Sequence, residues 1–380
     1  MSTETLFTNA RIVLEDRVID GSLAVADGRI AAIDSGRSGA ANALELDGDY
    51  LLPGLVELHT DNLEKHFSPR PGVRWPALPA VLGHDAQVAA AGITTVYDAV
   101  SLGDVSDGSA RRAYLESMVQ SVTAAVQSGA LRAEHRLHLR CEVSDPKCLD
   151  YYRACVDNPL VDLVSVMDHT GGQRQFASME IYRAFYKKQH RLDDAQFDAF
   201  HERRLAAHRE FSAPNRRAVV ALSRERGHRL ASHDDATPEH VAEAAADGVV
   251  IAEFPTTVEA ARAAREAGLA VLMGAPNLIL GGSHTGNASA LDLAHAGLLD
   301  ILSSDYVPGA LLEAAFCLTR EAGIALPAAV ATVTANPARA MGLTDRGSIA
   351  PGHNADLVRV RMIDGLPVVR AVWRRGERVI

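Results

Sequence analysis

The stretch that decides the fold runs from residue 51 to residue 76 and reads LLPGLVELHTDNLEKHFSPRPGVRWP. A proline-glycine turn leads into the apolar segment Leu55–Leu58, which predicts a short buried strand ending at His59-Thr60-Asp61. Residues two apart in a strand point to the same side, so His59 and Asp61 would project together. A nitrogen and an oxygen donor side by side form a potential metal-ligand pair. The same two residues also occur at the ends of ordinary strands, so the rest of the chain has to decide.

The composition is that of a globular protein with a large core. The chain has 380 residues, 47% of them hydrophobic, and a formal net charge of −10. This charge argues against a general nucleic-acid or anionic-membrane surface. The four cysteines form no CxxC pair, and no apolar run reaches membrane-spanning length. The first residues do not have the pattern of a signal peptide, so we expect a cytoplasmic protein.

Both ends of the chain are rich in short β-prone segments and glycine turns. Either set alone would leave unpaired strand edges, so we predict that they pair with each other. The expected small β-sandwich domain comprises residues 1–50 and 346–380, with a catalytic domain at 51–345 inserted between them.

The inserted region alternates between apolar strand signals and helical segments. This alternation predicts a (β/α)₈ TIM-like barrel of the α/β class, with a doubly wound open sheet as the alternative. The charged segment 178–226 is expected to be helical, either as a lid or as solvated helix surface. The predicted strands are Leu55–Leu58, Thr94–Val100, Arg136–Val143, Leu163–Met167, Arg229–Ser232, Val249–Phe254, Ala270–Gly274 and Ile301–Ser304.

Polar residues with metal-binding capacity follow nearly every one of these strands. A barrel places its chemistry at the carboxyl ends of its strands, so these side chains are expected to converge. The acidic ones can also cap the next helix, but a cap does not require imidazole. Several histidines and carboxylates at one rim suit one or two divalent ions. The residues are His59, Asp61, Glu142, Asp168, His169, His233, Asp234, Asp235, Glu253 and Asp305.

Two long motifs resemble the amidohydrolase superfamily. They are LLPGLVELHTD at residues 51–61 and NPARAMGLTDRGSIAPGHNADLV at residues 336–358. The superfamily usually ends its first barrel strand in His-x-His, whereas this chain has His59-x-Asp61. More narrowly, MDHTGGQRQF, ASHDDAT, LMGAPNLILGGSHTGN and DILSSDY are similar to the phosphonate-metabolism diphosphatases of the carbon–phosphorus lyase pathway.

The resemblance implies a divalent-metal centre, with two ions per subunit. It assigns His59 and Asp61 to one metal and His169 and His233 to the other. Glu142 takes the place of the bridging carboxylate, and Asp305 contacts the first metal and handles the proton. An aspartate at position 61 favours harder ions such as Mn²⁺ or Mg²⁺, with Zn²⁺ as the alternative.

The implied reaction is hydrolysis of alpha-D-ribose 1-methylphosphonate 5-triphosphate to the 5-phosphate and diphosphate. His284 is then a candidate catalytic acid beside Asp305. Any of the candidate substrate-binding residues could instead be a surface cation or part of a plain connecting loop. They are Lys65, Arg70, Arg74, Arg174, Gly282 and Ser283.

Two other functions remain open at this stage. The same barrel and metals would serve an amidohydrolase acting on a cyclic amide or N-acyl compound, and a barrel that has lost its metals would be a scaffold. The resemblance also implies a phosphorylated sugar as the small-molecule substrate, a possible homodimer and a functional link to the carbon–phosphorus lyase proteins.

Overall fold

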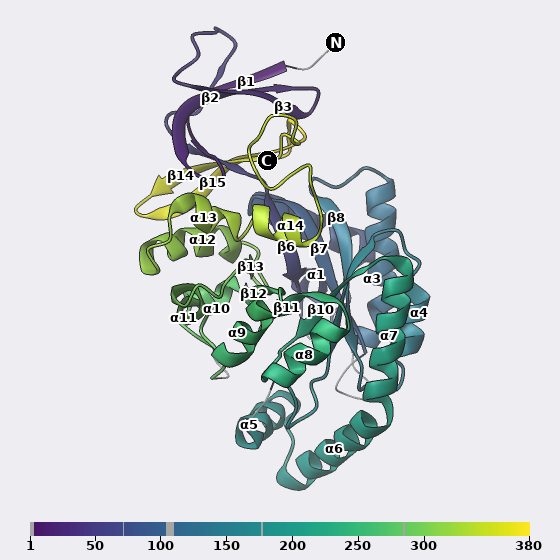
Figure 1. Ribbon diagram of the computed structural model, residues 1–380. Helices are drawn as coiled ribbons and strands as arrows, with labels where there is room; N and C mark the ends of the chain where they lie inside the picture. The colour runs from purple at the N-terminus through teal and green to yellow at the C-terminus, as the bar shows by residue number, and fades with distance from the viewer. Residues whose placement is uncertain (1–3, 71, 104–109, 176–177, 284–285) are drawn as a thin grey trace.

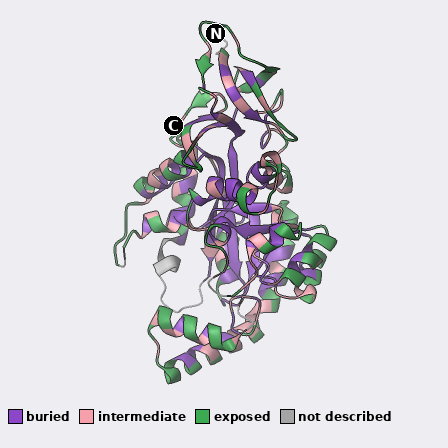
Figure 2. Cartoon of the chain, turned by 90° about the vertical axis from the view of Figure 1, so that its left-hand side faces the viewer, coloured by how far each residue is buried: buried purple, intermediate pink, exposed green. Residues whose placement is uncertain are grey.

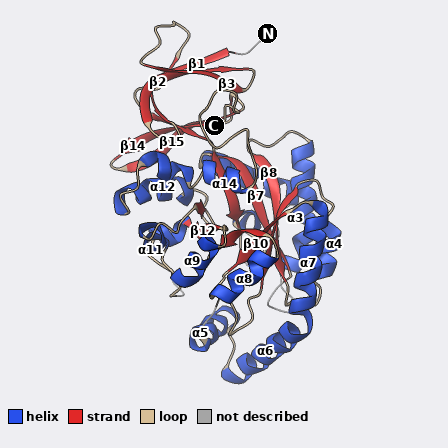
Figure 3. Ribbon diagram, in the orientation of Figure 1, coloured by secondary structure: helices blue, strands red, loops and turns tan. Residues whose placement is uncertain are grey.

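The computed structural model describes residues 4–70, 72–103, 110–175, 178–283 and 286–380, with only the backbone described for 110–114. Its strands form two separate sheets (Figure 1; Figure 3). Within the described ranges, no helix has the length and apolar character to cross a bilayer.

The larger structural unit is a parallel eight-stranded sheet in the order of the chain, which confirms the predicted (β/α)₈ barrel over the open sheet. Its two end strands meet through a parallel bridge between Thr60 and Asp305. The barrel therefore closes beside Asp61 and Asp305, two of the candidate site residues. The strands are β6 (Leu55–Thr60), β7 (Ile93–Leu102), β8 (Glu134–Glu142), β9 (Val161–Met167), β10 (Arg229–His233), β11 (Val249–Glu253), β12 (Ala270–Gly274) and β13 (Ile301–Ser303).

Helices cover the outside of this sheet because its strands are apolar on both faces. The short helix α1 (Asn62–Phe67) follows β6 directly. The covering helices are α2 (Ala77–Ala90), α3 (Ala110–Gln127), α4 (Cys148–Cys155), α7 (Ala213–Arg226), α8 (Pro238–Ala246), α9 (Val258–Glu266), α10 (Ala275–Ile279), α11 (Ala290–His295), α12 (Ala310–Glu321) and α13 (Leu326–Ala331).

The second sheet is built from both ends of the chain and encloses its own apolar core. Strand β5 pairs with β1 and with β14, so the first and last segments share one sheet. Strand β5 ends at Pro53, three residues beyond residue 50, where the first part of the small domain was predicted to end. The strands are β1 (Glu4–Val13), β2 (Val18–Ala26), β3 (Arg29–Ser35), β4 (Leu44–Glu45), β5 (Tyr50–Pro53), β14 (Leu357–Ile363), β15 (Leu366–Arg374) and β16 (Glu377–Arg378).

The chain passes from one sheet to the other at Gly54. Its amide donates to the carbonyl of Asp356 at 2.7 Å. A Cβ at this position would lie 2.1 Å from the hydroxyl oxygen of Thr94. Only glycine fits this crossing, which explains the proline-glycine turn in the opening motif.

The charged segment after β9 is helical, as predicted. It forms α5 (Met179–His190), α6 (Asp194–Ala207), the π-helical turn η1 (His208–Ser212) and then α7. Helices α5 and α6 project from the barrel on the side away from the terminal sheet, with exposed outer faces (Figure 1; Figure 2). They pack through their own small apolar cluster, which includes Tyr182 and Phe197.

The opposite end of the barrel is closed by α14 (Ala335–Ala340). Ala338 and Met341 extend the apolar interior of the barrel there. Because this amino-terminal end of the barrel is filled with apolar side chains, the open end is the one at the carboxyl ends of the strands.

Candidate metal centre

A first group of potential ligands joins the two ends of the barrel wall. It consists of His59 from β6, Asp61 at the start of α1 and Asp305 after β13, with ligand atoms within 4.8 Å of one another. The Asp61 amide donates to the Asp305 carbonyl at 2.8 Å, and the Asp305 amide donates to the His59 carbonyl at 3.1 Å. Asp305 also has a positive φ of 52°. The backbone thus holds these side chains together, and we call them the first ligand group.

A second ligand group consists of His169, His233 and Asp234, again with ligand atoms within 4.8 Å. Asp234 Oδ2 lies 3.5 Å from Nε2 of His233 and 3.7 Å from Nε2 of His169. This oxygen is buried and has no hydrogen-bond partner. Asp234, one of the acidic residues that could also have capped the next helix, therefore faces two imidazoles.

Glu253 at the end of β11 links the two groups. Its Oε1 lies 3.2 Å from Nδ1 of His59, and its Oε2 lies 3.2 Å from Nδ1 of His233. A carboxylate that accepts from Nδ1 fixes the tautomer and leaves Nε2 to ligate. One fully buried side chain therefore orients an imidazole in each group.

Glu142, the predicted bridging carboxylate, contacts His169 and Arg204. Its Oε2 accepts from Nδ1 of His169 at 2.6 Å, and its Oε1 accepts from Nη2 of Arg204 at 3.2 Å. None of the metal-capable groups among the described residues contains it. A carboxylate that accepts from Nδ1 of a histidine in this way orients the imidazole.

Arg140, which the sequence reasoning missed, lies between the two groups. Its Nη1 donates to Asp61 Oδ1 at 2.7 Å, and its Nη2 lies 3.4 Å from Nε2 of His233. The signal was the alternation of His138, Arg140 and Glu142 along β8, which places all three on one side of the strand. Both nitrogens of His138 are occupied, by the Leu58 carbonyl and the Ser165 hydroxyl, so it stabilises the interior.

The pKa shifts of the two ligand groups indicate that these groups lack positive charge. Burial, followed by the charge of Asp61, raises the pKa of Asp305 to about 7. Burial raises the pKa of Asp234 to about 6, and burial together with Arg140 lowers the pKa of His59 to about 3. Burial lowers the pKa of His233 as well. The uncharged imidazoles of His59 and His233, beside carboxylates that lack enough positive charge, form a donor set that a divalent cation satisfies. The orphaned Asp234 oxygen fits the same conclusion.

The predicted substrate-binding residues are dispersed. Lys65 donates to the Tyr306 carbonyl beside the first ligand group. Arg174 is buried in ion pairs with Asp235 and Glu243, and both Arg70 and Arg74 are exposed. Gly282 and Ser283 follow α10, and His284 lies outside the described residues.

A further buried set of histidine and aspartate residues lies outside the barrel wall, between β7, β8 and α2. Asp98 accepts from Nε2 of His84 and from Nδ1 of His135, each at 2.7 Å. Nε2 of His135 lies 3.3 Å from Asp85. We call these four residues the outer cluster. Its ligand atoms are also close enough for a metal, but they already bind one another.

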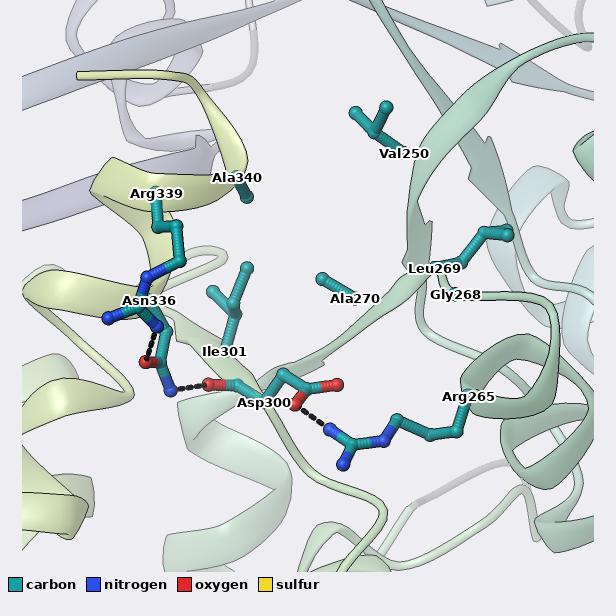
Figure 4. Close-up of a pocket in the computed structure, with 10 residues that line it drawn as sticks. All are labelled: Val250, Arg265, Gly268, Leu269, Ala270, Asp300, Ile301, Asn336, Arg339 and Ala340. Atoms are coloured by element: carbon teal, nitrogen blue, oxygen red, sulfur yellow. Dashed lines mark hydrogen bonds and ion pairs between the residues drawn. The ribbon is translucent and has the colours of Figure 1, made fainter. Parts of the chain in front are cut away.

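A pocket of about 460 Å³ lies at the other end of the barrel (Figure 4). Its residues include Ala270 and Ile301, at the starts of β12 and β13, and Arg265, which is paired with Asp300. Barrel enzymes carry out their chemistry at the carboxyl ends of the strands, so this pocket lies at the wrong end for the metal centre.

Comparison with known proteins agrees with the fold and the motifs. The family model described as the Amidohydrolase family matches residues 86–379. The chain is 50% identical to the alpha-D-ribose 1-methylphosphonate 5-triphosphate diphosphatase of Escherichia coli, over 98% of this chain and 100% of that protein. A shorter match of 37% identity links 23% of this chain to 26% of the imidazolonepropionase of Streptomyces griseus.

Solved structures share the fold at low sequence identity. A Xaa-Pro dipeptidase aligns with a TM-score of 0.68 and 16% identity over 99% of both chains. The 5-methylcytosine deaminase of Klebsiella pneumoniae aligns with a TM-score of 0.66 and 15% identity, over 100% of this chain and 97% of that one. On the family match and the full-length relative, this chain belongs to the amidohydrolase family.

Proposed function

We propose that the protein hydrolyses alpha-D-ribose 1-methylphosphonate 5-triphosphate to the 5-phosphate and diphosphate in phosphonate catabolism. The observation that carries this proposal is the 50% identity to the Escherichia coli diphosphatase across the whole of that protein. The amidohydrolase superfamily is metal-dependent, and this chain holds matching histidine and aspartate groups. These groups argue against the metal-free scaffold.

We assign one divalent ion to each ligand group. The first group offers one imidazole and two carboxylates, and the second offers two imidazoles and one carboxylate. More oxygen in the first group favours a harder ion there, such as Mn²⁺ or Mg²⁺, and the second suits Zn²⁺ as well. Bound ions would lower the pKa of the attacking water and offset charge on the phosphoryl oxygens.

The chain's own residues then have distinct roles. Water attacks the α-phosphorus, the bond from that phosphorus to the bridging oxygen of the β-phosphate breaks, and diphosphate leaves. Asp305 accepts the proton of the water, because its carboxylate belongs to the first ligand group and lies beside the position expected for the attacking water. Arg140 is placed to stabilise negative charge that develops between the two groups.

The experiment that tests this proposal is phosphorus NMR of the products formed in H₂¹⁸O. Attack at the α-phosphorus puts the label in the ribose 5-phosphate product, and attack at the β-phosphorus puts it in diphosphate. A panel of cyclic amides and N-acyl compounds, run in parallel, tests the alternative C–N hydrolase. Amide turnover without diphosphate release would reject the phosphorus substrate.

The substrate class, the oligomeric state and the pathway partners are predictions that follow from the proposed reaction. A phosphorylated sugar is the expected substrate, and a homodimer and a functional link to the carbon–phosphorus lyase proteins remain expectations from the resemblance. Sedimentation of the purified protein tests the dimer directly.

A further inference from the structure

A pocket of about 620 Å³ opens beside the first ligand group, between α1, α2 and the loop after β13. We call it the side pocket and define it by Lys65, His66, Trp75, Gln87 and Tyr306. The pocket is next to the first ligand group along the chain, because Tyr306 in its wall directly follows Asp305 and Asn62, also in its wall, directly follows Asp61. Its volume is in the range of small-molecule sites.

We propose that the side pocket binds the sugar half of the substrate, a ribose that carries one anionic substituent. This inference rests on the proposed function and adds the direction in which the substrate lies across the metal centre. The triphosphate end would then extend toward Arg140, which lies between the ligand groups.

The wall chemistry favours a sugar. Trp75 is 51% exposed although it is one of only two tryptophans in the chain. Tyr306 adds a second ring, and the Lys65 ammonium lies 5.1 Å from its centroid. Aromatic faces pack against the apolar side of a sugar ring, while a few polar groups fix its orientation.

The same wall is poorly suited to diphosphate. A leaving diphosphate carries several negative charges and needs several cations. Among the described wall residues, Lys65 is the single lysine or arginine, and the others include Pro69, Pro79 and Val307. One ammonium matches one phosphonate group, so the pocket suits the sugar end.

A chain of hydrogen bonds fixes the floor of the pocket. Nε2 of His84 donates to Asp98, so its Nδ1 accepts from the Asn62 amide at 3.0 Å. The Asn62 amide and Nε2 of His66 both donate to Oε1 of Gln87, at 3.0 Å and 2.9 Å. The amide orientation of Gln87 is thereby set. Its nitrogen makes no hydrogen bond within the described residues and is left to donate to a ligand.

Gly83 makes room for this arrangement. A Cβ at Gly83 would lie 3.0 Å from Nδ1 of His66, so the imidazole rests against the bare backbone of α2. Alanine suits a helix better than glycine, so Gly83→Ala disturbs His66 without threatening the fold. This gives a second variant beside Trp75→Ala.

The test compares two substrates on the metal-loaded protein: the ribosyl methylphosphonate triphosphate, and methyl triphosphate, which has no sugar. We expect Trp75→Ala to lower the ratio of their kcat/KM values about tenfold or more, mainly through KM of the ribosyl substrate. Gly83→Ala should lower the same ratio by less. The matched control is Leu366→Ala, an exposed residue of the terminal sheet, which should keep the wild-type ratio. An unchanged ratio in both pocket variants would overturn the proposal.

A binding experiment separates this inference from the proposed function. Calorimetry with ribose 1-methylphosphonate, which has no triphosphate, should detect binding to the metal-loaded wild type and weaker binding to Trp75→Ala. Trp75-dependent binding without turnover of either triphosphate would leave the subsite standing and reject the proposed reaction. Turnover of the ribosyl triphosphate, together with binding that is unchanged in Trp75→Ala and Gly83→Ala, would support the proposed reaction and reject the sugar subsite.

Discussion

The ligand groups at the mouth of the barrel and the outer cluster contain the same residue types in opposite electrostatic states. In the outer cluster every charge has a partner. Burial opposes ionisation there, yet His135 and His84 hold the pKa of Asp98 below its usual value. At the mouth, the carboxylates of Asp234 and Asp305 have raised pKa values, and one buried oxygen has no partner.

This difference shows how a binding site is distinguished from a structural network. Polar groups that satisfy one another stabilise the fold and have little capacity left for a ligand. Groups held together by the backbone but left short of positive charge are preorganised for a cation. Mutations in the two regions should therefore have separable effects on metal content, activity and stability.

The largest effect is expected at the mouth. His169→Ala should lose about one metal ion per chain and reduce kcat by ~10³-fold or more, because the lost ion supplies several kcal/mol of charge stabilisation. Metal analysis and phosphate-release assays measure both. In chelator, the variant should lose less stability than Asp98→Asn does, because Glu142 keeps Arg204 as a partner when the imidazole is removed. A variant that keeps full metal content would remove His169 from the site.

The matched change in the outer cluster is Asp98→Asn. Removing one partner of a buried, hydrogen-bonded charge set should lower the free energy of unfolding by about 3–5 kcal/mol. Metal content should stay at the wild-type value. Urea unfolding and metal analysis of the same preparation provide the comparison, and loss of metal with unchanged stability would reverse our assignment of the two regions.

An intermediate effect is expected for Glu253→Gln. The variant keeps the shape of the side chain but removes the charge that orients His59 and His233, so metal affinity should fall by about 10–100-fold. Excess metal should restore most of the activity. Competition with a chelating dye measures the affinity. If affinity falls for one ion alone, then Glu253 does not couple the groups.

The smallest effect is the pH dependence of the outer cluster. Burial opposes its charge, but Asp98 and Asp85 raise the pKa of His135 to about 9. The unfolded value is about 6.5, so this stabilisation is complete below about pH 6.5 and is lost as the pH rises through about 9. The stability difference between wild type and His135→Asn should shrink over that window. Urea unfolding in chelator from pH 6 to 10 tests this, and a constant difference would mean that His135 is neutral.

Local sequence patterns predicted the barrel and the convergence of polar strand-end residues at one rim, whereas the grouping of Asp305 with His59 and Asp61 came from the family resemblance. The apolar strands alternate regularly with helices, and strand ends necessarily meet at one rim. Other roles depend on contacts between distant segments. Glu142 is occupied by Arg204 from α6, which no strand pattern reveals. Glu253 ended a predicted strand, but its contacts with His59 and His233 depend on the strand register, which is irregular in β6 between Glu57 and Thr60.

The most direct test of the central claim is anomalous diffraction from crystals of the protein grown with Mn²⁺ or Zn²⁺. We expect one peak bounded by His59, Asp61 and Asp305, another bounded by His169, His233 and Asp234, and none in the outer cluster. A peak at Asp98 between His84 and His135, with no density at the mouth, would contradict it.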